Sequence, residues 1–197
     1  RGNIYDRNGN VLAMSATVYN LILSPRDLVA SVEAKDYHVD GKLDEDRYHA
    51  AIAKVQEDLK RDLLQLIPDL DEETLDRHIQ ATKYAYRVLK TDIEQEEYDV
   101  IQAYITEHKT GPALYLSPDT KRYYPYASLA SQVIGFVNKE GGAYGIEAAY
   151  NSELEGSSGR VVTTKAANGT ELMNSYSNFI DPVNGYDLNL TIDANIQ

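Results

Sequence analysis

The chain has 197 residues, of which 43% are hydrophobic and 25% are charged, a composition typical of a globular protein and unlike that of a disordered one. Its 31 acidic and 19 basic residues give a formal net charge of -12, which argues against the concentrated basic face that nucleic-acid binding needs. It has no cysteine, so disulfide frameworks and thiol chemistry are excluded.

Extended structure is predicted for residues 1 to about 30. The opening stretch RGNIYDRNGN contains an Asn8-Gly9 turn signal, and the stretch after it, VLAMSATVYNLIL, is rich in β-branched and aliphatic residues and stops at Pro25. This pattern predicts a hairpin followed by a strand. The apolar run is much shorter than the roughly 18 to 20 residues of a membrane span.

Helices are predicted next, between about Asp44 and His108. The first is capped by Asp44, ends at Pro68 and has apolar residues at steps of three and four, on one face: Tyr48, Ile52, Val55, Leu59 and Leu63. Asp71 caps a short second helix that carries Leu75 and Ile79. A third helix, from about Asp92 to His108, carries Ile93, Val100, Ile101, Tyr104 and Ile105.

The last part of the chain returns to extended structure after the TGP stretch at 110–112. GRVVTTKAANGTELMNSY predicts a hairpin around an Asn168-Gly169 turn. Before it, Ile146, Ala149, Tyr150 and Leu154 form one helical ridge that the glycines at 156 and 159 end. GYDLNLTIDANIQ alternates Leu188, Leu190 and Ile192 with polar residues, as a half-buried strand does.

These elements together predict an α+β fold. The β-rich parts lie at about 1–32 and 111–197, and a helical insertion at about 33–110 separates them.

No catalytic, metal or cofactor site is predicted. The four histidines are scattered, and 31 acidic residues produce adjacent carboxylates by chance, with nothing to place a pair in an apolar pocket. Lys109-Thr110-Gly111 matches one active-site motif of serine transpeptidases, but that site also needs Ser-x-x-Lys and Ser-x-Asn, and the sequence contains neither. We therefore interpret Lys109-Thr110-Gly111 as the end of a helix.

The opening stretch carries the strongest functional signal. RGNIYDRNGNVLA resembles, almost position for position, the first motif of class B penicillin-binding proteins, Arg-Gly-x-Ile-x-Asp-Arg-Asn-Gly-x-x-Leu-Ala. Arg1, Gly2, Asp6, Arg7 and Gly9 all match it. Nine fixed positions in thirteen make this match specific.

Further motifs of the family follow in the same order. RYYP, with Arg122 and Pro125, resembles the second motif, and GAYGIEAAYNSELEGSSG resembles the third through Gly145, Glu147 and Gly156. LTIDANIQ, with Thr191 and Asp193, is similar to the signature that introduces the transpeptidase domain. The resemblance therefore frames essentially the whole chain.

The resemblance implies that residues 1–197 are the N-terminal pedestal, or dimerisation, domain of a monofunctional penicillin-binding protein. It implies an elongated pedestal of β-strands and hairpins with an inserted helical subdomain, standing at the extracytoplasmic face of the bacterial cell membrane. One transmembrane helix precedes the first motif in this family, and a D,D-transpeptidase domain, absent from this chain, follows the last.

A scaffold role follows from the same resemblance. The implied partners are the chain's own transpeptidase domain, a polytopic peptidoglycan glycosyltransferase, morphogenesis proteins and a second copy in a homodimer. The helical region 44–108 is the predicted contact surface. Two other functions stay open: an exported glycan-binding module, suggested by 16 tyrosines, and a self-contained hydrolase or transpeptidase.

The motif residues are predicted to hold shape. Arg1 and Arg7 flank Asp6, and Arg122 and Glu147 come from distant sequence, so we expect one ion-pair and hydrogen-bond network that ties the strands together. Gly2, Gly9, Gly145 and Gly156 are expected to supply positive φ or close backbone approach.

Overall fold

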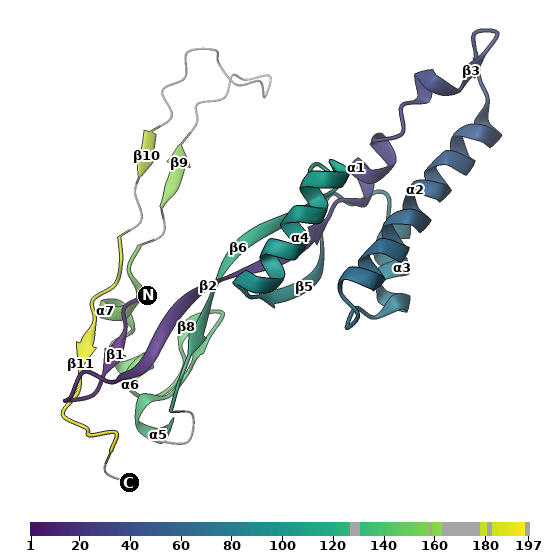
Figure 1. Cartoon of the computed structure of the whole chain (residues 1–197). Coiled ribbons are helices and arrows are strands. Elements are labelled where there is room, and N and C mark those ends of the chain that lie inside the picture. Colours follow the sequence, from purple (N-terminus) through teal and green to yellow (C-terminus); the bar gives the residue numbers. More distant parts are fainter. Residues whose placement is uncertain (127–130, 158, 163–177, 181–182, 196–197) are drawn as a thin grey trace. The chain divides into compact units, whose positions relative to one another are not determined.

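The chain forms two compact units in the computed structural model, which describes residues 1–126, 131–157, 159–162, 178–180 and 183–195. Unit 1 consists of Arg1–Ala16 and Arg122–Gln197, and unit 2 of Thr17–Lys121. Figure 1 follows the chain through both. The strands β2 (Val11–Leu23) and β6 (Leu114–Tyr123) each contain one of the two unit boundaries. The units are therefore divided within strands.

The sheet of unit 1 is built on its first and last strands. They are β1 (Ile4–Tyr5), the start of β2, and β11 (Leu188–Asn189). β1 pairs antiparallel with β2 and parallel with β11, where Ile4 lies opposite Leu188. The predicted hairpin is confirmed, with Gly9 at a φ of 84° in its turn. The alternation of the last segment is confirmed too, since Leu188, Leu190 and Ile192 are half-buried while Asp187, Asn189 and Thr191 are exposed.

Short elements complete unit 1. They are α5 (Ser131–Ile134), β7 (Val137–Asn138), β8 (Gly141–Gly142), α6 (Gly145–Ala149), α7 (Asn151–Glu155), β9 (Arg160–Val162) and β10 (Asn178–Ile180). The prediction of one helix across α6 and α7 is wrong: the helix breaks at Tyr150, and Ala149 and Tyr150 are exposed. The strands β9 and β10 pair antiparallel, while the predicted Asn168-Gly169 turn lies outside the described residues.

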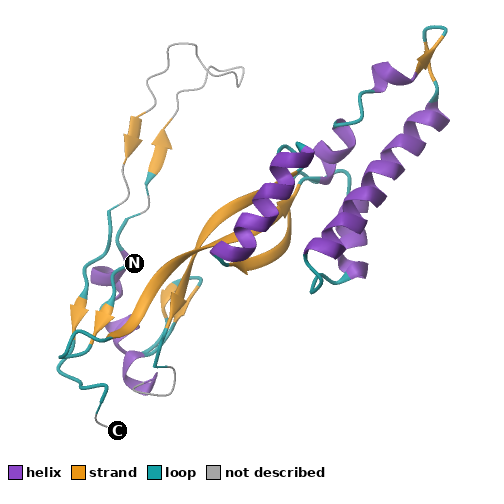
Figure 2. Cartoon of the chain, in the orientation of Figure 1, coloured by secondary structure: helices purple, strands orange, loops and turns teal. Residues whose placement is uncertain are grey.

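Unit 2 packs helices on a short sheet, as Figure 2 shows in purple and orange. Its elements are α1 (Pro25–Ala30), the 3-10 helix η1 (Ala34–Tyr37), β3 (His38–Val39), β4 (Lys42–Leu43), α2 (Glu45–Leu66), α3 (Glu72–Gln80), β5 (Arg87–Ile93) and α4 (Gln95–His108). Both β5 and β6 pair with β2. The α+β prediction is confirmed.

The predicted helix starts of unit 2 are confirmed where a side chain caps the helix. The carboxylates of Asp44 and Asp71 accept hydrogen bonds from the amides of Arg47 and Thr74 at the starts of α2 and α3. The third helix, α4, starts three residues later than predicted, at Gln95, because the chain before it is a strand.

The strand β5 is the main element that the sequence pattern did not predict. Ile93, which the periodicity placed on the third helix, is the last residue of β5 and is fully buried. Asp92, the residue before Ile93 in β5, has a φ of 59°, so the backbone is locally left-handed near the end of the strand. Val100, predicted on the buried face of α4, is 54% exposed.

Each unit has its own apolar core. In unit 2 the side chains of α2, α3 and α4 pack with β2 and β6 around Leu21, Leu63 and Ile101. In unit 1 a smaller core gathers Ile4, Leu12 and Leu154. Within the part of the chain that the structure describes, no helix has the length and apolar character needed to cross a membrane.

Candidate functional site

Unit 1 contains a buried ionic cluster centred on Glu147 of α6. Arg1 donates from Nε and Nη2 to Glu147 Oε2 at 2.9 and 2.7 Å, and Arg122 of β6 donates from Nε to Glu147 Oε1 at 2.8 Å. The Glu147 side chain is completely buried, and those of Arg1 and Arg122 are 10% and 7% exposed. One carboxylate therefore joins residues that are 146 and 25 positions away in sequence.

The two guanidinium groups of the cluster also bind neighbouring backbone and side chains. Arg122 Nη1 donates to the carbonyl of Gly2 at 2.7 Å and to Ser15 Oγ at 3.1 Å, and Arg1 Nη1 donates to Asn151 Oδ1 at 2.8 Å. Tyr124 places its hydroxyl 3.5 Å from Glu147 Oε1, and burial together with the negative Glu147 raises the pKa of Tyr124. These bonds fix both arginines, so the cluster acts as a clamp on β1, β2 and α6.

Asp6 forms a second buried site, separate from the arginines. Its carboxylate accepts from the amides of Asn8 and Asn10, both at 2.8 Å, from Asn10 Nδ2 at 2.9 Å and from the amide of Ala194 at 3.0 Å. Burial acts to raise the pKa of Asp6, but these hydrogen bonds outweigh it and lower the pKa to about 2. Asp6 thus joins the first hairpin to a segment 188 residues later.

Two glycines allow the close backbone approaches around these sites. A Cβ on Gly2 would lie 2.0 Å from the carbonyl oxygen of Tyr186, and one on Gly145 would lie 2.5 Å from that of Val133. Gly145 also has a φ of 62°, which residues with a side chain rarely adopt. The geometry that brings Arg1 and Glu147 together therefore requires glycine at both positions.

The prediction of one network is wrong in part, because the structure forms two. Arg1, Arg122 and Glu147 come together as predicted, but Asp6 is held by amides instead of arginines. Arg7 is exposed, and its backbone amide donates to the carbonyl of Ile192.

The remaining predicted residues lie around the two sites. Gly156 has a φ of 68° at the end of α7, while Pro125 and Thr191 are exposed. Asp193 accepts from the amide of Asn195 at 3.0 Å, and this bond is the main cause of the lowered pKa of Asp193.

Sequence reasoning missed the amide partners Asn10, Asn151 and Ala194. Asn10 could have been found, because an aspartate followed by asparagines and glycine is typical of side-chain-capped turns. Ala194 binds through its backbone amide, which leaves no signature in the sequence.

The chemistry of these sites is structural. The carboxylates of Glu147 and Asp6 and the guanidinium groups of Arg1 and Arg122 are engaged by charge-assisted hydrogen bonds, although the buried Nη2 of Arg122 has no partner within the described residues. Within the described ranges, no group of three or more histidine, aspartate or glutamate side chains could hold a metal ion. Lys109 is the left-handed C-cap of α4, as predicted for the end of a helix, with a φ of 54°.

The sequence matches one family model, described as the penicillin-binding protein dimerisation domain, over residues 1–190. Among curated proteins, the chain is 28% identical over 203 residues to peptidoglycan D,D-transpeptidase FtsI of Buchnera aphidicola and 26% identical over 199 residues to stage V sporulation protein D of Bacillus subtilis. Both matches cover 100% of the chain, but only 30% and 26% of those relatives.

Solved structures share the fold. Penicillin-binding protein 2X from Streptococcus thermophilus matches with a TM-score of 0.63 and 19% identity, covering 100% of this chain and 29% of that one. A complex between PBP2 and MreC from Helicobacter pylori matches with a TM-score of 0.64 and 22% identity, covering 99% and 35%.

Proposed function

Because the chain belongs to the penicillin-binding protein dimerisation domain family, we propose that it is the non-catalytic scaffold of a peptidoglycan D,D-transpeptidase. In this role it positions the catalytic domain at the extracytoplasmic face of the membrane and docks proteins of cell-wall synthesis. The chain spans less than a third of FtsI of Buchnera aphidicola, which is named a peptidoglycan D,D-transpeptidase, and less than a third of stage V sporulation protein D, so catalysis is assigned to the remainder of the parent.

The observation that carries this proposal is the way unit 1 ties the two ends of the chain together. β1 and β11 pair in parallel, Asp6 accepts from Ala194, and Arg1 binds Glu147. In a parallel pair the chain enters and leaves at opposite ends of the strands. A preceding membrane anchor and a following domain would thus connect to opposite ends of one clamped strand pair, an arrangement suited to a rigid spacer.

Labelling with fluorescent penicillin tests the non-catalytic part of the proposal. A competent serine nucleophile is acylated by penicillin and retains the label, so residues 1–197 are expected to stay unlabelled while the full-length parent is labelled. A labelled 1–197 chain would show a nucleophile within it, which would overturn the scaffold assignment in favour of a self-contained enzyme.

Docking is supported by the exposed helices of unit 2 and by a similar protein, PBP2 of Helicobacter pylori, whose structure was solved in complex with MreC. We propose that unit 2 contacts a morphogenesis protein or a polytopic peptidoglycan glycosyltransferase. A homodimer is the further assembly that this family assignment suggests. Deleting residues 44–108 is a poor test, because it removes β5 and exposes the buried side of β2.

Co-purification tests docking without that damage. The tagged full-length parent is expressed with the morphogenesis proteins and glycosyltransferases of its own genome, and with surface variants of α2 and α4 that keep the fold. At least one of these proteins is expected to co-purify with the wild type and to be lost from a surface variant. Failure of all of them to co-purify with the wild type would contradict the docking role.

A further inference from the structure

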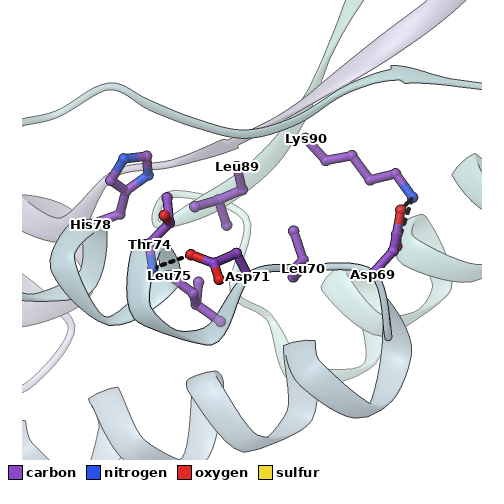
Figure 3. A pocket seen from close by; sticks show the side chains of 8 residues that line it. All are labelled: Asp69, Leu70, Asp71, Thr74, Leu75, His78, Leu89 and Lys90. Carbon is purple, nitrogen blue, oxygen red and sulfur yellow. Dashed lines mark hydrogen bonds and ion pairs between the residues drawn. The ribbon is translucent and has the colours of Figure 1, made fainter.

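Unit 2 has a small cavity between α3 and β5, with a volume of about 260 Å³. Figure 3 shows Leu70, Leu75 and Leu89 between the Asp69–Lys90 ion pair on one side and His78 on the other. The three leucines supply the apolar part of the lining, and the charged pair lies at its edge. Asp71 and Thr74 also line the cavity, but the Asp71 carboxylate is already bonded to the Thr74 amide at 2.8 Å. The cavity therefore suits one apolar side chain better than a polar small molecule.

A β-bulge creates the lining. In the β2–β5 ladder, Ile22 lies opposite Val88 and Leu21 opposite Lys90, so Leu89 is an extra residue on β5. Bulges turn a side chain away from its regular direction and occur beside binding sites. Leu89 lines the cavity while its neighbour Val88 is 37% exposed and does not.

A second hollow adjoins the cavity and shares Lys90 with it. This hollow has a volume of about 640 Å³ and is lined by Asp92, Glu94, Glu96 and Glu97 besides Lys90 and Gln95. Lys90 Nζ lies 2.6 Å from Glu97 and 2.9 Å from Asp69, and Lys121 Nζ lies 3.3 Å from Asp92. The lining of this hollow carries four carboxylates and one lysine, so its formal charge is negative.

The cavity wall also contains a polar atom without a partner. His78 Nδ1 is buried and accepts or donates no hydrogen bond within the described structure. Burial, together with the positive charges of Arg87 and Arg77, lowers the pKa of His78, so the ring is neutral at pH 7.

We propose that these two hollows, here named the α3/β5 groove, bind a segment of a partner protein in which an apolar side chain is followed by lysine or arginine. The apolar side chain enters the leucine-lined cavity, and the basic residue lies against Asp92, Glu96 and Glu97. Charge complementarity identifies the occupant, because an acidic segment would meet like charge at the second hollow. This inference deepens the proposed docking function and rests on it.

Peptide selection on the 1–197 chain tests the groove. A displayed library of random nonapeptides is selected for binding, and enriched peptides are synthesised and measured by fluorescence anisotropy. We expect enrichment of an apolar residue next to lysine or arginine. Binding should weaken at least tenfold with Leu89→Phe, which fills the cavity, and with Glu96→Lys, which reverses a charge of the second hollow.

Two matched variants control for general effects. Val88→Phe adds the same ring on the neighbouring residue outside the cavity, and Glu107→Lys reverses an exposed charge near the other end of α4. Both should bind within twofold of the wild type. Enrichment of acidic peptides, or equal binding by Leu89→Phe and Glu96→Lys, would overturn the proposal.

Measurements of self-association and of partner co-purification distinguish a wrong occupant, a wrong groove and a wrong docking function. If the 1–197 chain dimerises by sedimentation and Leu89→Phe abolishes the dimer, the occupant is a second copy and the proposed partner segment is wrong. If the natural partner co-purifies equally with wild type and with both groove variants, the groove inference fails while the docking function stands. If no partner co-purifies with the wild type, the docking function itself fails.

Discussion

The two units of the molecule are stabilised in different ways. Unit 2 has a cluster of thirteen buried apolar residues, and its buried polar residues, Ser24 and Gln56, are uncharged. Among its described residues, unit 1 has six in its apolar cluster, and it buries the carboxylates of Asp6 and Glu147. Apolar packing accepts any side chain of suitable volume, whereas a buried charge requires particular partners at particular distances. This difference explains why the fixed motifs lie in unit 1.

Removing the Glu147 carboxylate should destabilise unit 1, and this is the largest of the predicted effects. Glu147→Ala leaves the buried guanidinium groups of Arg1 and Arg122 without their counter-ion, and we expect a loss of about 3 to 5 kcal/mol in unfolding free energy. Denaturant unfolding measures the loss, and hydrogen exchange should place it in β1 and α6.

Three further variants test whether a buried charge in unit 1 tolerates substitution less well than a buried apolar side chain in unit 2. Glu140→Ala removes an exposed carboxylate of unit 1 and should cost under about 0.5 kcal/mol. In unit 2, Leu63→Met conserves volume in a fully buried position and should cost less than about 1.5 kcal/mol. Glu147→Gln also conserves volume, yet it should cost more than Leu63→Met. Equal losses from these two substitutions would remove the contrast between the units.

Replacing one glycine in each unit by alanine compares the two units through a smaller loss of unfolding free energy. Gly145 in unit 1 and Gly41 in unit 2 have similar φ values, 62° and 78°. A Cβ on Gly145 would lie 2.5 Å from the Val133 carbonyl oxygen, whereas a Cβ on Gly41 meets nothing within 4 Å. Gly145→Ala should therefore lower the unfolding free energy by more than Gly41→Ala, which should cost on the order of 1 kcal/mol for backbone strain alone. Thermal melts of both variants check this, and a larger loss from Gly41→Ala would contradict it.

The same contrast decides how much could be predicted from the sequence. The starts of α2 and α3 were predictable because Asp44 and Asp71 are local caps, and Leu59 and Leu63 repeat with helical spacing. A β-bulge interrupts the two-residue alternation by which a strand is predicted. In β5 the extra residue Leu89 and the left-handed Asp92 both interrupt it. The apolar Ile93 therefore fitted the spacing of the next helix equally well. The break at Tyr150 was hidden for a similar reason, because two short helices can imitate one apolar ridge.

The site shows a second limit. The fixed spacing of the motifs identified Arg1, Arg122 and Glu147, and opposite charges predicted that they meet. Charge alone could not show that Asp6 binds amides, since the amide of Ala194 reaches it only through the pairing of β1 with β11. Side-chain partners are therefore predictable from residue type, while backbone partners depend on the fold.

Mild acid should lower the stability of unit 2 and leave that of unit 1 unchanged, and this is the smallest of the predicted effects. The pKa of His78 in unit 2 lies below its ordinary 6.5, because of burial and then Arg87 and Arg77, so below pH 6.5 the unfolded chain takes up a proton that the folded chain does not. The contribution of neutral His78 to the unfolding free energy of unit 2 is therefore fully present above pH 6.5 and is lost as the pH falls below that value. Asp6 in unit 1 has a pKa of about 2 against 3.8, so its contribution is complete above about pH 4 and is lost only between there and about pH 2. Between pH 7 and 5, hydrogen exchange corrected for intrinsic rates should show falling protection in unit 2 and constant protection in unit 1, and His78→Gln should remove the fall. A parallel fall in β1 and β11 would show that the two units respond to acid alike.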